Sequence, residues 1–578
     1  MGTNTLIADL RHLIKDEQTV AYERLYRIWE RPLAQKLQQG WTQGFAKLEQ
    51  GPDAGSLWAY PDASESRFRE GDLLCLHEGD ALEPLCSRLI FELEDDERWL
   101  LRGKFAGAAW AAYSGGRCFA DPDAIDLTPY YEQALQDIVA STLGQETILP
   151  LLSGELLPGF DEADMEEGLC VAYSEGFNSQ QAEAVSWAHA AHHVACIQGP
   201  PGTGKTRVLG LIARMAVERG ERVLVTSHTH MAINNALNAI HAQGVPAVKV
   251  GRATQCKALN RAIECVEGLD DWSERPQEPG AGYVVGATPF ATCSARLANY
   301  SFDTVIFDEA SQVTLPLALM AMRKGRRYLF VGDQKQLPPV LLSRSVLDKS
   351  DASVFAKLAS IEADHLIMLD ETYRMNQWLT QWPSTTYYAG RLRAAGPNAQ
   401  RCLSLPAIAQ QWQPVLGDEA SMVFIPTRDL RARTINQRDA QLVLQLCKAL
   451  VQAGLALEDI AVISPYRAQG RAVRSLLKAH WGAEAARAIV VDTVERMQGQ
   501  EREVVILSLT SGDPLFIATM AEFLFQPERL NVSITRARTK LIVIGPELPR
   551  AFDCRNEAVA RWVQQYRDLL TQCKKAVL

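Results

Sequence analysis

Short apolar runs alternate with amphipathic segments over the chain beyond residue 170. A first group of runs comprises residues 194–197, 223–226, 283–287, 304–307 and 328–331, and a second group comprises 422–425, 460–464, 489–494, 504–509 and 541–544. Continuous Val, Ile and Leu runs are typical of parallel strands buried on both faces. The pattern therefore predicts two successive α/β lobes, which we expect at residues 171–350 and 351–550.

The first 170 residues follow a different pattern. Residues 1–50 have helical periodicity, which predicts a helical stalk. Residues 51–125 contain short strand-like pieces separated by Gly- and Asp-containing turns, as in a small antiparallel β-barrel-like domain. Residues 126–170 predict a second stalk helix with a linker, and residues 551–578 predict a C-terminal helix.

Composition adds few constraints. The 47% hydrophobic and 22% charged residues are those of an ordinary soluble globular protein. We see no apolar run long enough for a bilayer and no basic, apolar secretory start, so we expect a cytoplasmic protein without a membrane partner. The net charge of -10 does not indicate nucleic-acid binding, but it does not exclude it, because only a local groove needs to be basic.

The cysteines do not indicate a metal site. The chain has 12 of them, with no C-x-x-C pair and no Cys/His cluster at zinc spacing. We therefore expect reduced thiols, mostly buried as small core side chains, and no bound zinc.

A glycine-rich segment after the run 194–197 carries the strongest chemical signal. It opens a helical pattern and reads Gly199, Pro200, Pro201, Gly202, Thr203, Gly204, Lys205 and Thr206. Between a strand and a helix, such a segment turns its backbone N–H groups toward phosphates. Lys205 is then expected to reach the β- and γ-phosphates, and the Thr206 hydroxyl to bind Mg²⁺. The segment predicts ATP and Mg²⁺ as cofactors.

Two adjacent carboxylates, Asp308 and Glu309, follow the apolar run 304–307. Residues at the carboxyl end of a parallel strand face the crevice in which ligands bind. An isolated acidic pair is more often a helix cap, but this pair shares its lobe with the glycine-rich segment. We therefore expect Asp308 to complete the Mg²⁺ shell and Glu309 to take a proton from the attacking water.

The order of these and further motifs resembles that of the superfamily 1 helicases. The resemblance is to the group typified by the Upf-like nonsense-mediated-decay helicase and the immunoglobulin-mu-binding helicase. It covers residues 177–545, and its motifs are 177–185, 199–206, 227–234, 308–312, 332–339, 369–375, 463–469, 491–501 and 529–538. The resemblance implies two tandem RecA-like P-loop lobes with parallel sheets, preceded by a helical stalk and a small β-barrel.

The resemblance also implies roles around the nucleotide. Gln181 would read the adenine, Tyr373 would lie near the base, and Glu501 would approach the ribose. Gln336 would sense the γ-phosphate and link it to the nucleic-acid strand.

The second lobe would supply two arginines to the phosphates. Arg374 and Arg536 match the positions of the family's arginine fingers, although by composition alone each would be a surface residue. Positive charge on the γ-phosphate is what hydrolysis needs as its transition state forms. Thr372, close to Arg374, stands where the family usually has Gln.

Strand contacts are implied at five positions. Thr229 and His230 lie in the motif of lobe 1 that contacts the strand, and Pro465, Tyr466 and Thr493 lie in the corresponding motifs of lobe 2. Such contacts go mainly to phosphates and base faces, so we expect little sequence preference.

The sequence thus predicts an ATP-dependent helicase or translocase on single-stranded nucleic acid, moving 5′ to 3′ by analogy with the family. A monomer is compatible with this prediction, and RNA and DNA remain equal candidates. Two alternatives stay open: a nucleic-acid-stimulated ATPase that remodels complexes without unwinding, and a P-loop switch ATPase acting on proteins. A non-hydrolysing binding module is disfavoured, because Lys205, Asp308 and Glu309 are all intact.

Overall fold

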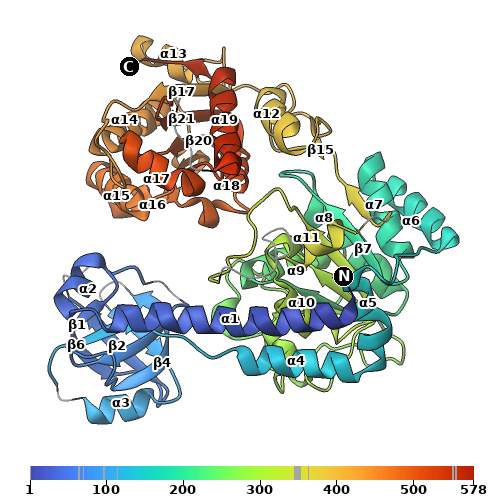
Figure 1. The fold of residues 1–578 in the computed structure, drawn as a ribbon. Coiled ribbons are helices and arrows are strands. Elements are labelled where there is room, and N and C mark those ends of the chain that lie inside the picture. Colours follow the sequence, from blue (N-terminus) through green and yellow to red (C-terminus); the bar gives the residue numbers. More distant parts are fainter. Residues whose placement is uncertain are drawn as a thin grey trace.

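The structure is a computed structural model that describes residues 2–62, 66–68, 71–95, 98–113, 115–343, 353–361, 364–549, 552 and 556–577. It consists of a barrel, a long helix and two lobes built on parallel sheets (Figure 1). The expected boundaries at residues 350/351 and 550/551 lie outside the described residues. Among the described residues, no helix combines the length and apolarity that a bilayer crossing needs.

The N-terminal barrel is closed and antiparallel, with strand order β1-β2-β5-β4-β3-β6. Its strands are β1 Gln43–Gln50, β2 Ser56–Pro61, β3 Leu73–His77, β4 Cys86–Asp95, β5 Arg98–Arg102 and β6 Cys118–Pro122, with α3 Ala106–Ala112 between the last two. The expected boundary at residue 50/51 is therefore wrong. Residues 43–50 form a barrel strand instead of a helix, because Phe45 and Leu48 are buried in the barrel core.

The stalk joins this barrel to lobe 1. Helix α1 (Thr3–Trp29) runs along lobe 1 to the barrel, where α2 (Leu33–Gln39) follows (Figure 1). Leu6, Leu10 and Leu13 of α1 are buried in one core with α4 (Thr128–Ala140), the π-helical turn η1 (Gly144–Ile148), α5 (Leu149–Ser153) and the sheet of lobe 1. Stalk and lobe 1 therefore pack as one body.

Lobe 1 is built on an eight-stranded parallel sheet of order β10-β9-β11-β8-β12-β13-β7-β14. Its strands are β7 Val194–Gln198, β8 Arg222–Thr226, β9 Ala247–Val250, β10 Glu264–Val266, β11 Tyr283–Gly286, β12 Thr304–Phe307, β13 Arg327–Gly332 and β14 Leu366–Met368. The helices are α6 Glu162–Ser174, α7 Ser179–Ala190, α8 Lys205–Glu218, α9 His230–His241, α10 Leu315–Met322 and α11 Val354–Ala359.

Three strands of this sheet, β9, β10 and β14, were not among the expected runs. They are short, and β9 carries Lys249 in its middle, so their apolar signal is weak. Strand β14 pairs with β7 although it follows residue 350, so the sheet of lobe 1 extends past the expected end of that lobe.

Lobe 2 has a six-stranded sheet of order β19-β18-β20-β21-β17-β22. Its strands are β17 Met422–Pro426, β18 Ile460–Ile463, β19 Val490–Asp492, β20 Arg502–Ser508, β21 Ala537–Gly545 and β22 Lys574–Lys575. The helices are α12 Gln377–Tyr387, α13 Gln413–Leu416, α14 Gln437–Gln452, α15 Arg467–Trp481, α16 Ala483–Ala488, α17 Pro514–Leu524, α18 Pro527–Ile534 and α19 Glu557–Gln572. The expected C-terminal helix is thus α19, and the edge strand β22 follows it.

One cysteine pair departs from the expected chemistry. The sulfur atoms of Cys256 and Cys265 lie next to each other, a pairing that the expectation of separate reduced thiols does not include. The loop after β9 folds back beside β10 and brings the two residues together, a proximity that their spacing in the sequence does not reveal. The other cysteines in the described part of the chain are free, and most of them are buried.

Candidate nucleotide cleft and strand-facing surfaces

The P-loop lies between β7 and α8, as its sequence predicts. Gly202 and Gly204 have φ angles of 77° and 82°, in the left-handed region that favours glycine. A Cβ on Gly202 would lie 2.4 Å from the Cβ of Arg374, and one on Gly199 would lie 2.0 Å from the Cγ of Lys205. Glycine is therefore required where the loop packs against lobe 2 and against its own lysine.

The carboxylates Asp308 and Glu309 follow β12 directly. Burial, together with the negative charge of Glu309, raises the pKa of Asp308 to about 7, although Lys205 acts in the opposite direction. Glu309 has a φ of 51° and accepts a hydrogen bond of 3.2 Å from Nε2 of Gln498 in lobe 2. A nearby positive charge stabilises the ionised form of a buried carboxyl group, so Asp308 suits a cation site.

Arg374 reaches the cleft from lobe 2 but is paired within its own lobe. Its Nε donates to Glu501 and its Nη1 donates to the carbonyl of Thr535 at 3.1 Å. Arg538 donates to the same carboxylate at 2.9 Å. Although burial opposes them, these two arginines lower the pKa of Glu501. Contact of Glu501 with a ribose stays a prediction, since its carboxylate is engaged by arginines.

Arg536 is more deeply enclosed, with 1% of its side chain exposed. Its guanidinium donates to the carbonyls of Val532 at 2.9 Å and Gln500 at 3.3 Å. Burial and then the neighbouring positive charge of Arg374 lower its pKa to about 9. The protein thus holds two guanidiniums close together in lobe 2, which favours an anion between the lobes.

These groups line one interlobe cleft of about 850 Å³. The expected residues that line it are Pro201, Gly202, Thr203, Gly204, Lys205, Thr206, Thr229, Asp308, Glu309, Gln336, Tyr373, Arg374, Glu501 and Arg536. Gly199, Pro200 and Gln181 are not among the lining residues. Gln181 accepts from the N–H of Asn178 at 3.2 Å and donates to the carbonyl of Thr203 at 3.0 Å, so it braces the P-loop. Its contact with adenine stays a prediction.

A short segment after β14, residues 372–373, is hydrogen-bonded directly to the P-loop. The Thr372 hydroxyl donates to the carbonyl of Pro201 at 2.8 Å, and the N–H of Tyr373 donates to that of Gly202 at 2.9 Å. Sequence reasoning noted Thr372 only as a departure from the family pattern. The Thr372 side chain is short enough to fit against the backbone carbonyl of Pro201, which a longer side chain would displace.

Gln336 belongs to a buried hydrogen-bond chain that crosses between the lobes. Its Nε2 donates to Asp333 at 2.9 Å, and the hydroxyl of Tyr388 donates to the same oxygen at 2.7 Å. Asn531 then donates to the hydroxyl of Tyr388 at 2.8 Å and to the carbonyl of Lys335 at 2.7 Å. A displacement of Gln336 is therefore felt in α18 of lobe 2, because Asp333 and the Tyr388 hydroxyl connect it to Asn531 through buried hydrogen bonds.

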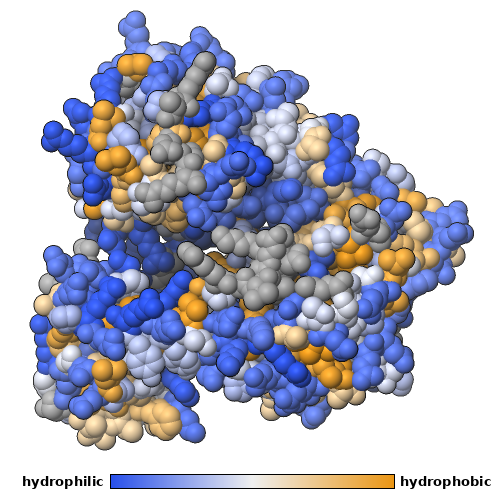
Figure 2. Space-filling model, in the orientation of Figure 1, coloured by the Kyte–Doolittle hydropathy of each residue, from blue (hydrophilic) through white to orange (hydrophobic). Residues whose placement is uncertain are grey.

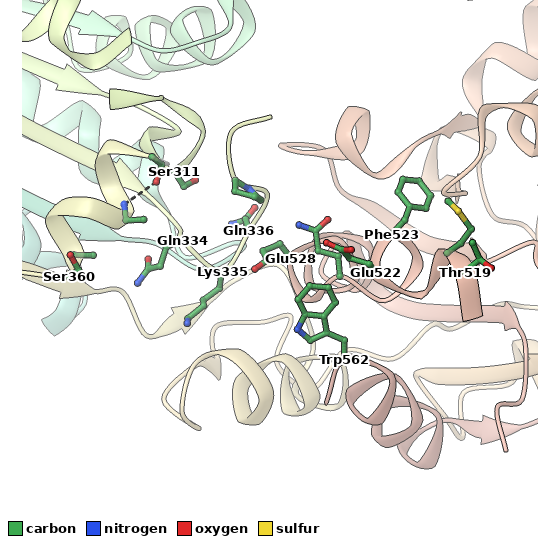
Figure 3. A pocket seen from close by; sticks show the side chains of 16 residues that line it. Ser311, Gln334, Lys335, Gln336, Ser360, Thr519, Glu522, Phe523, Glu528 and Trp562 are labelled. Carbon is green, nitrogen blue, oxygen red and sulfur yellow. Dashed lines mark hydrogen bonds between the residues drawn. The ribbon is translucent and has the colours of Figure 1, made fainter. Parts of the chain in front are cut away.

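Gln336 also lines a second interlobe cleft, of about 810 Å³. Figure 3 shows Lys335 and Gln336 of lobe 1 opposite Phe523, Glu528 and Trp562 of lobe 2. No P-loop residue lines this cleft, so the nucleotide site is the first one. Both clefts lie between the same two lobes and share Gln336, so any change in the interlobe spacing alters both.

A third cleft, of about 620 Å³, separates the barrel from lobe 2. Figure 2 shows the surface hollowed where these parts face one another. Pro465 and Tyr466 line it together with Arg67 of the barrel, and Thr493 lines an adjoining hollow of about 170 Å³ with Arg67 and Tyr466. The structure therefore brings the three expected strand residues of lobe 2 to one place.

Arg67 is a residue that the sequence did not single out. Its guanidinium stacks 4.2 Å from the ring of Trp41, and its pKa is lowered by burial and by the positive charges of Arg467 and Arg471. Guanidiniums and aromatic rings at a cleft are what a sequence-tolerant single-strand site uses. No local pattern predicts the cluster, because Arg67 and Arg467 are 400 residues apart.

Thr229 and His230 do not join that cleft. Thr229 caps α9 by accepting from the N–H of Ala232 at 3.2 Å, and it lines the nucleotide cleft. His230 is half-buried, and its Nδ1 is enclosed without a partner among the described residues. Their strand contacts stay predictions, on a different face from Pro465 and Tyr466.

The fold and the cleft define a class: two parallel-sheet lobes, one with a P-loop and an acidic pair and the other with two arginines, make a two-lobe P-loop ATPase. Residues 176–382 match one family described as an AAA domain, and residues 350–547 match a second family with the same description.

Similar proteins narrow the class. The chain is 26% identical over 481 residues to "DNA replication ATP-dependent helicase/nuclease DNA2" of Saccharomyces cerevisiae, covering 78% of this chain and 31% of that protein. It is 26% identical over 436 residues to "DNA polymerase alpha-associated DNA helicase A" of Schizosaccharomyces pombe, covering 64% of each. These matches make the chain similar to ATP-dependent helicases, in keeping with the resemblance of its ordered motifs to the superfamily 1 helicases.

One solved structure also matches over most of the chain. It is that of arterivirus nonstructural protein 10 (helicase), at 12% identity, covering 89% of this chain and 80% of that one with a TM-score of 0.37. This score is too low for the likeness to support a functional conclusion. The chain spans only 31% of the DNA2 relative, so the activity of that whole protein is not carried over.

Proposed function

We propose that the chain is an ATP-driven helicase or translocase on single-stranded nucleic acid, moving 5′ to 3′. One observation carries the proposal. A single cleft gathers Lys205, Asp308 and Glu309 from lobe 1 and Arg374 and Arg536 from lobe 2. Because hydrolysis needs groups from both lobes, it is coupled to the distance between the two lobes. A change in this distance is what would move a bound strand.

The lobe 1 residues fit Mg²⁺ and a triphosphate. Asp308 and Thr206 line the cleft with oxygen donors, and burial together with the adjacent Glu309 raises the pKa of Asp308, an effect that a bound cation would oppose. These two residues would hold Mg²⁺, which when bound supplies positive charge beside the phosphate oxygens. The P-loop N–H groups and Lys205 would hold the phosphates, and Glu309 would accept the proton of the attacking water.

The lobe 2 arginines require a change of partner. Arg374 is bound to Glu501, so engaging a γ-phosphate means exchanging one anion for another. Arg538 donates to Glu501 as well and would keep that carboxylate paired after the exchange. Binding of the triphosphate would therefore move the Arg374 guanidinium from Glu501 to the phosphates, while the Arg374 backbone already packs against the P-loop.

The barrel–lobe 2 cleft is the proposed strand site, with Arg67, Tyr466 and Thr493 as contacts. Arginine side chains bind phosphates and aromatic rings stack on bases, so such a site holds a strand without reading its sequence. The closer grouping with the Upf-like helicases is also a proposal; the stalk and the closed barrel ahead of lobe 1 support it. The direction of movement rests on the same resemblance.

The experiment is ATP turnover by the full chain with a poly-ribonucleotide, a poly-deoxyribonucleotide or neither. We expect stimulation by at least one polymer, and a loss of about a hundredfold or more in Glu309→Gln, while the surface variant Glu278→Gln matches wild type. Displacement of a duplex with a 5′ or a 3′ overhang then separates unwinding from remodelling and reports the direction. Turnover that ignores both polymers would overturn the nucleic-acid assignment.

A further inference from the structure

The segment that begins at Gln336 contacts three parts of the protein. Gln336 itself lines the nucleotide cleft, and the next residue, Leu337, is buried in the apolar core of lobe 2. Pro338 and Pro339 follow, and two adjacent prolines leave the backbone little freedom, so the segment is locally stiff. Its end at Ser343 lies against the stalk helix α1. A stiff segment passes a shift at Gln336 on toward α1.

Glu17 of α1 holds the end of this segment. Its carboxylate accepts from the backbone N–H groups of Leu342 at 2.9 Å and Ser343 at 2.6 Å, and the Ser343 hydroxyl donates to it at 2.5 Å. Arg24, about two helical turns further along α1, donates to the carbonyl of Leu342 at 3.1 Å. Because three of these four hydrogen bonds end on one carboxylate, Glu17 is the main attachment of α1 to the segment.

The same helix is attached to the barrel at its other end. The indole N–H of Trp29, the last residue of α1, donates to the carbonyl of Pro122 in β6 at 2.9 Å. Lys36 of α2 forms a buried ion pair with the neighbouring residue of β6, Asp121. An α-helix rises about 18 Å over the 12 residues from Glu17 to Trp29, so a small tilt of α1 at Glu17 displaces the barrel.

The barrel residues at this attachment border the cleft that we propose for the nucleic acid. Pro122 lines that cleft together with Pro465 and Tyr466 of lobe 2. The first half of α1 is buried in the core of lobe 1, whereas in the described part of the chain the hydrogen bonds from its second half to lobe 1 come from Glu17 and Arg24. These bonds therefore help to set the angle at which α1 carries the barrel beside lobe 2 (Figure 1).

We propose that Glu17 is a positioning residue through which the nucleotide state of the cleft sets how tightly the barrel and lobe 2 hold single-stranded nucleic acid. The proposal rests on the proposed function and adds the barrel to the parts that respond to ATP. A γ-phosphate at Gln336 shifts the segment, Glu17 follows the two N–H groups that it binds, and α1 moves β6 relative to lobe 2. Among the described residues that line the nucleotide cleft, none belongs to α1, so Glu17 acts through the segment and the helix.

The test compares the affinity of the full chain for a fluorescent single-stranded oligonucleotide without nucleotide and with a non-hydrolysable ATP analogue and Mg²⁺. The affinity of wild type should change about tenfold between these two states, a typical coupling between sites. Glu17→Ala should bind within about threefold of wild type without nucleotide, but its affinity should change less than about twofold when the analogue is added. Glu23→Ala is the matched control, because Glu23 is an exposed residue of the same helix whose ion pair is with Arg27. It should keep the full change.

A purely structural role of Glu17 predicts a different result. A loosened stalk would lower the affinity by the same factor in both nucleotide states, so the ratio of the two affinities would stay at the wild-type value and the proposal would be overturned. ATP turnover without polymer should keep its kcat and KM in Glu17→Ala, because the nucleotide cleft is unchanged. A raised KM for ATP would show that Glu17 supports the cleft itself, against the proposal.

The results for wild type separate this proposal from the proposed function. If polymer stimulates turnover but the analogue leaves the oligonucleotide affinity unchanged, the role of Glu17 is overturned and the proposed function stands. If wild type neither binds the oligonucleotide nor responds to polymer, both proposals fail together. Arg24→Ala, which removes one of the four hydrogen bonds, should reduce the change in affinity less than Glu17→Ala does.

Discussion

Arg374 at the nucleotide cleft and the buried Lys249 of lobe 1 differ in how their positive charges are matched. In the cleft, Arg374 is paired with Glu501, and Gln336 donates a hydrogen bond to Asp333. In lobe 1, by contrast, the Nζ of Lys249 and the Nδ1 of His230 have no hydrogen-bond partner among the described residues. Satisfied charges hold the lobes in a defined arrangement, whereas unsatisfied ones favour a ligand that brings the missing charge.

The largest expected effect lies on the cleft side of this comparison. Arg536→Ala should lower the rate of ATP turnover about a thousandfold, because an arginine at the transferring phosphate acts on the transition state. Single-turnover kinetics with saturating polymer measure the rate, and Arg326→Ala on the surface of lobe 1 is the control. A rate within threefold of wild type would show that the buried guanidinium only holds lobe 2 together.

A paired buried lysine provides the contrast to Lys249. Lys36 is buried beside Asp121, with which it forms an ion pair between α2 and the barrel. Lys36→Met should lower the free energy of unfolding by about 3 kcal/mol, because the buried Asp121 carboxylate loses its ammonium partner and keeps only Thr42 and His77. Urea denaturation measures this, and an unchanged midpoint would contradict the pairing.

Lys249→Met should do the reverse and raise the free energy of unfolding by about 1–3 kcal/mol in the absence of nucleic acid. The pKa of Lys249 is about 7 in the folded protein and near 10.5 when unfolded. The unfolded chain binds more protons between these values, so wild type gains stability as pH rises from 7 toward 10. The advantage of the variant should therefore be full below pH 7 and shrink above it, as urea denaturation at several pH values would show.

The smallest expected effect concerns coupling. Tyr388→Phe removes the hydroxyl that joins Asp333 to Asn531, so stimulation of ATP turnover by polymer should fall about three- to tenfold. Tyr387→Phe is the matched control, because its buried hydroxyl has no partner in the described part of the chain. Equal stimulation in both variants would place the coupling elsewhere.

Some features of this protein could be predicted from the sequence because functional residues lie close in the chain to the strands that position them. The P-loop and the pair Asp308–Glu309 each follow a buried strand within one or two residues, so the covalent chain itself delivers them to the ligand edge. The two lobes and the barrel could be expected for the same reason, since periodic apolar positions report which residues are buried. The expected barrel boundary at residue 50/51 is wrong because β1 has few periodic apolar positions and is held in the barrel by its partners β2 and β6.

Tertiary structure alone decided the partners of the charged groups. Whether Arg374 meets Glu501, whether Arg67 comes beside Arg467 and whether Lys249 has any partner depend on contacts between segments far apart in the chain. Composition cannot report such contacts, because a charged side chain carries the same letter whether it is paired, solvated or buried alone. The sequence determined which chemistry each lobe carries, and only the packing of barrel, stalk and lobes decided which of those charges are satisfied and which are left for a ligand.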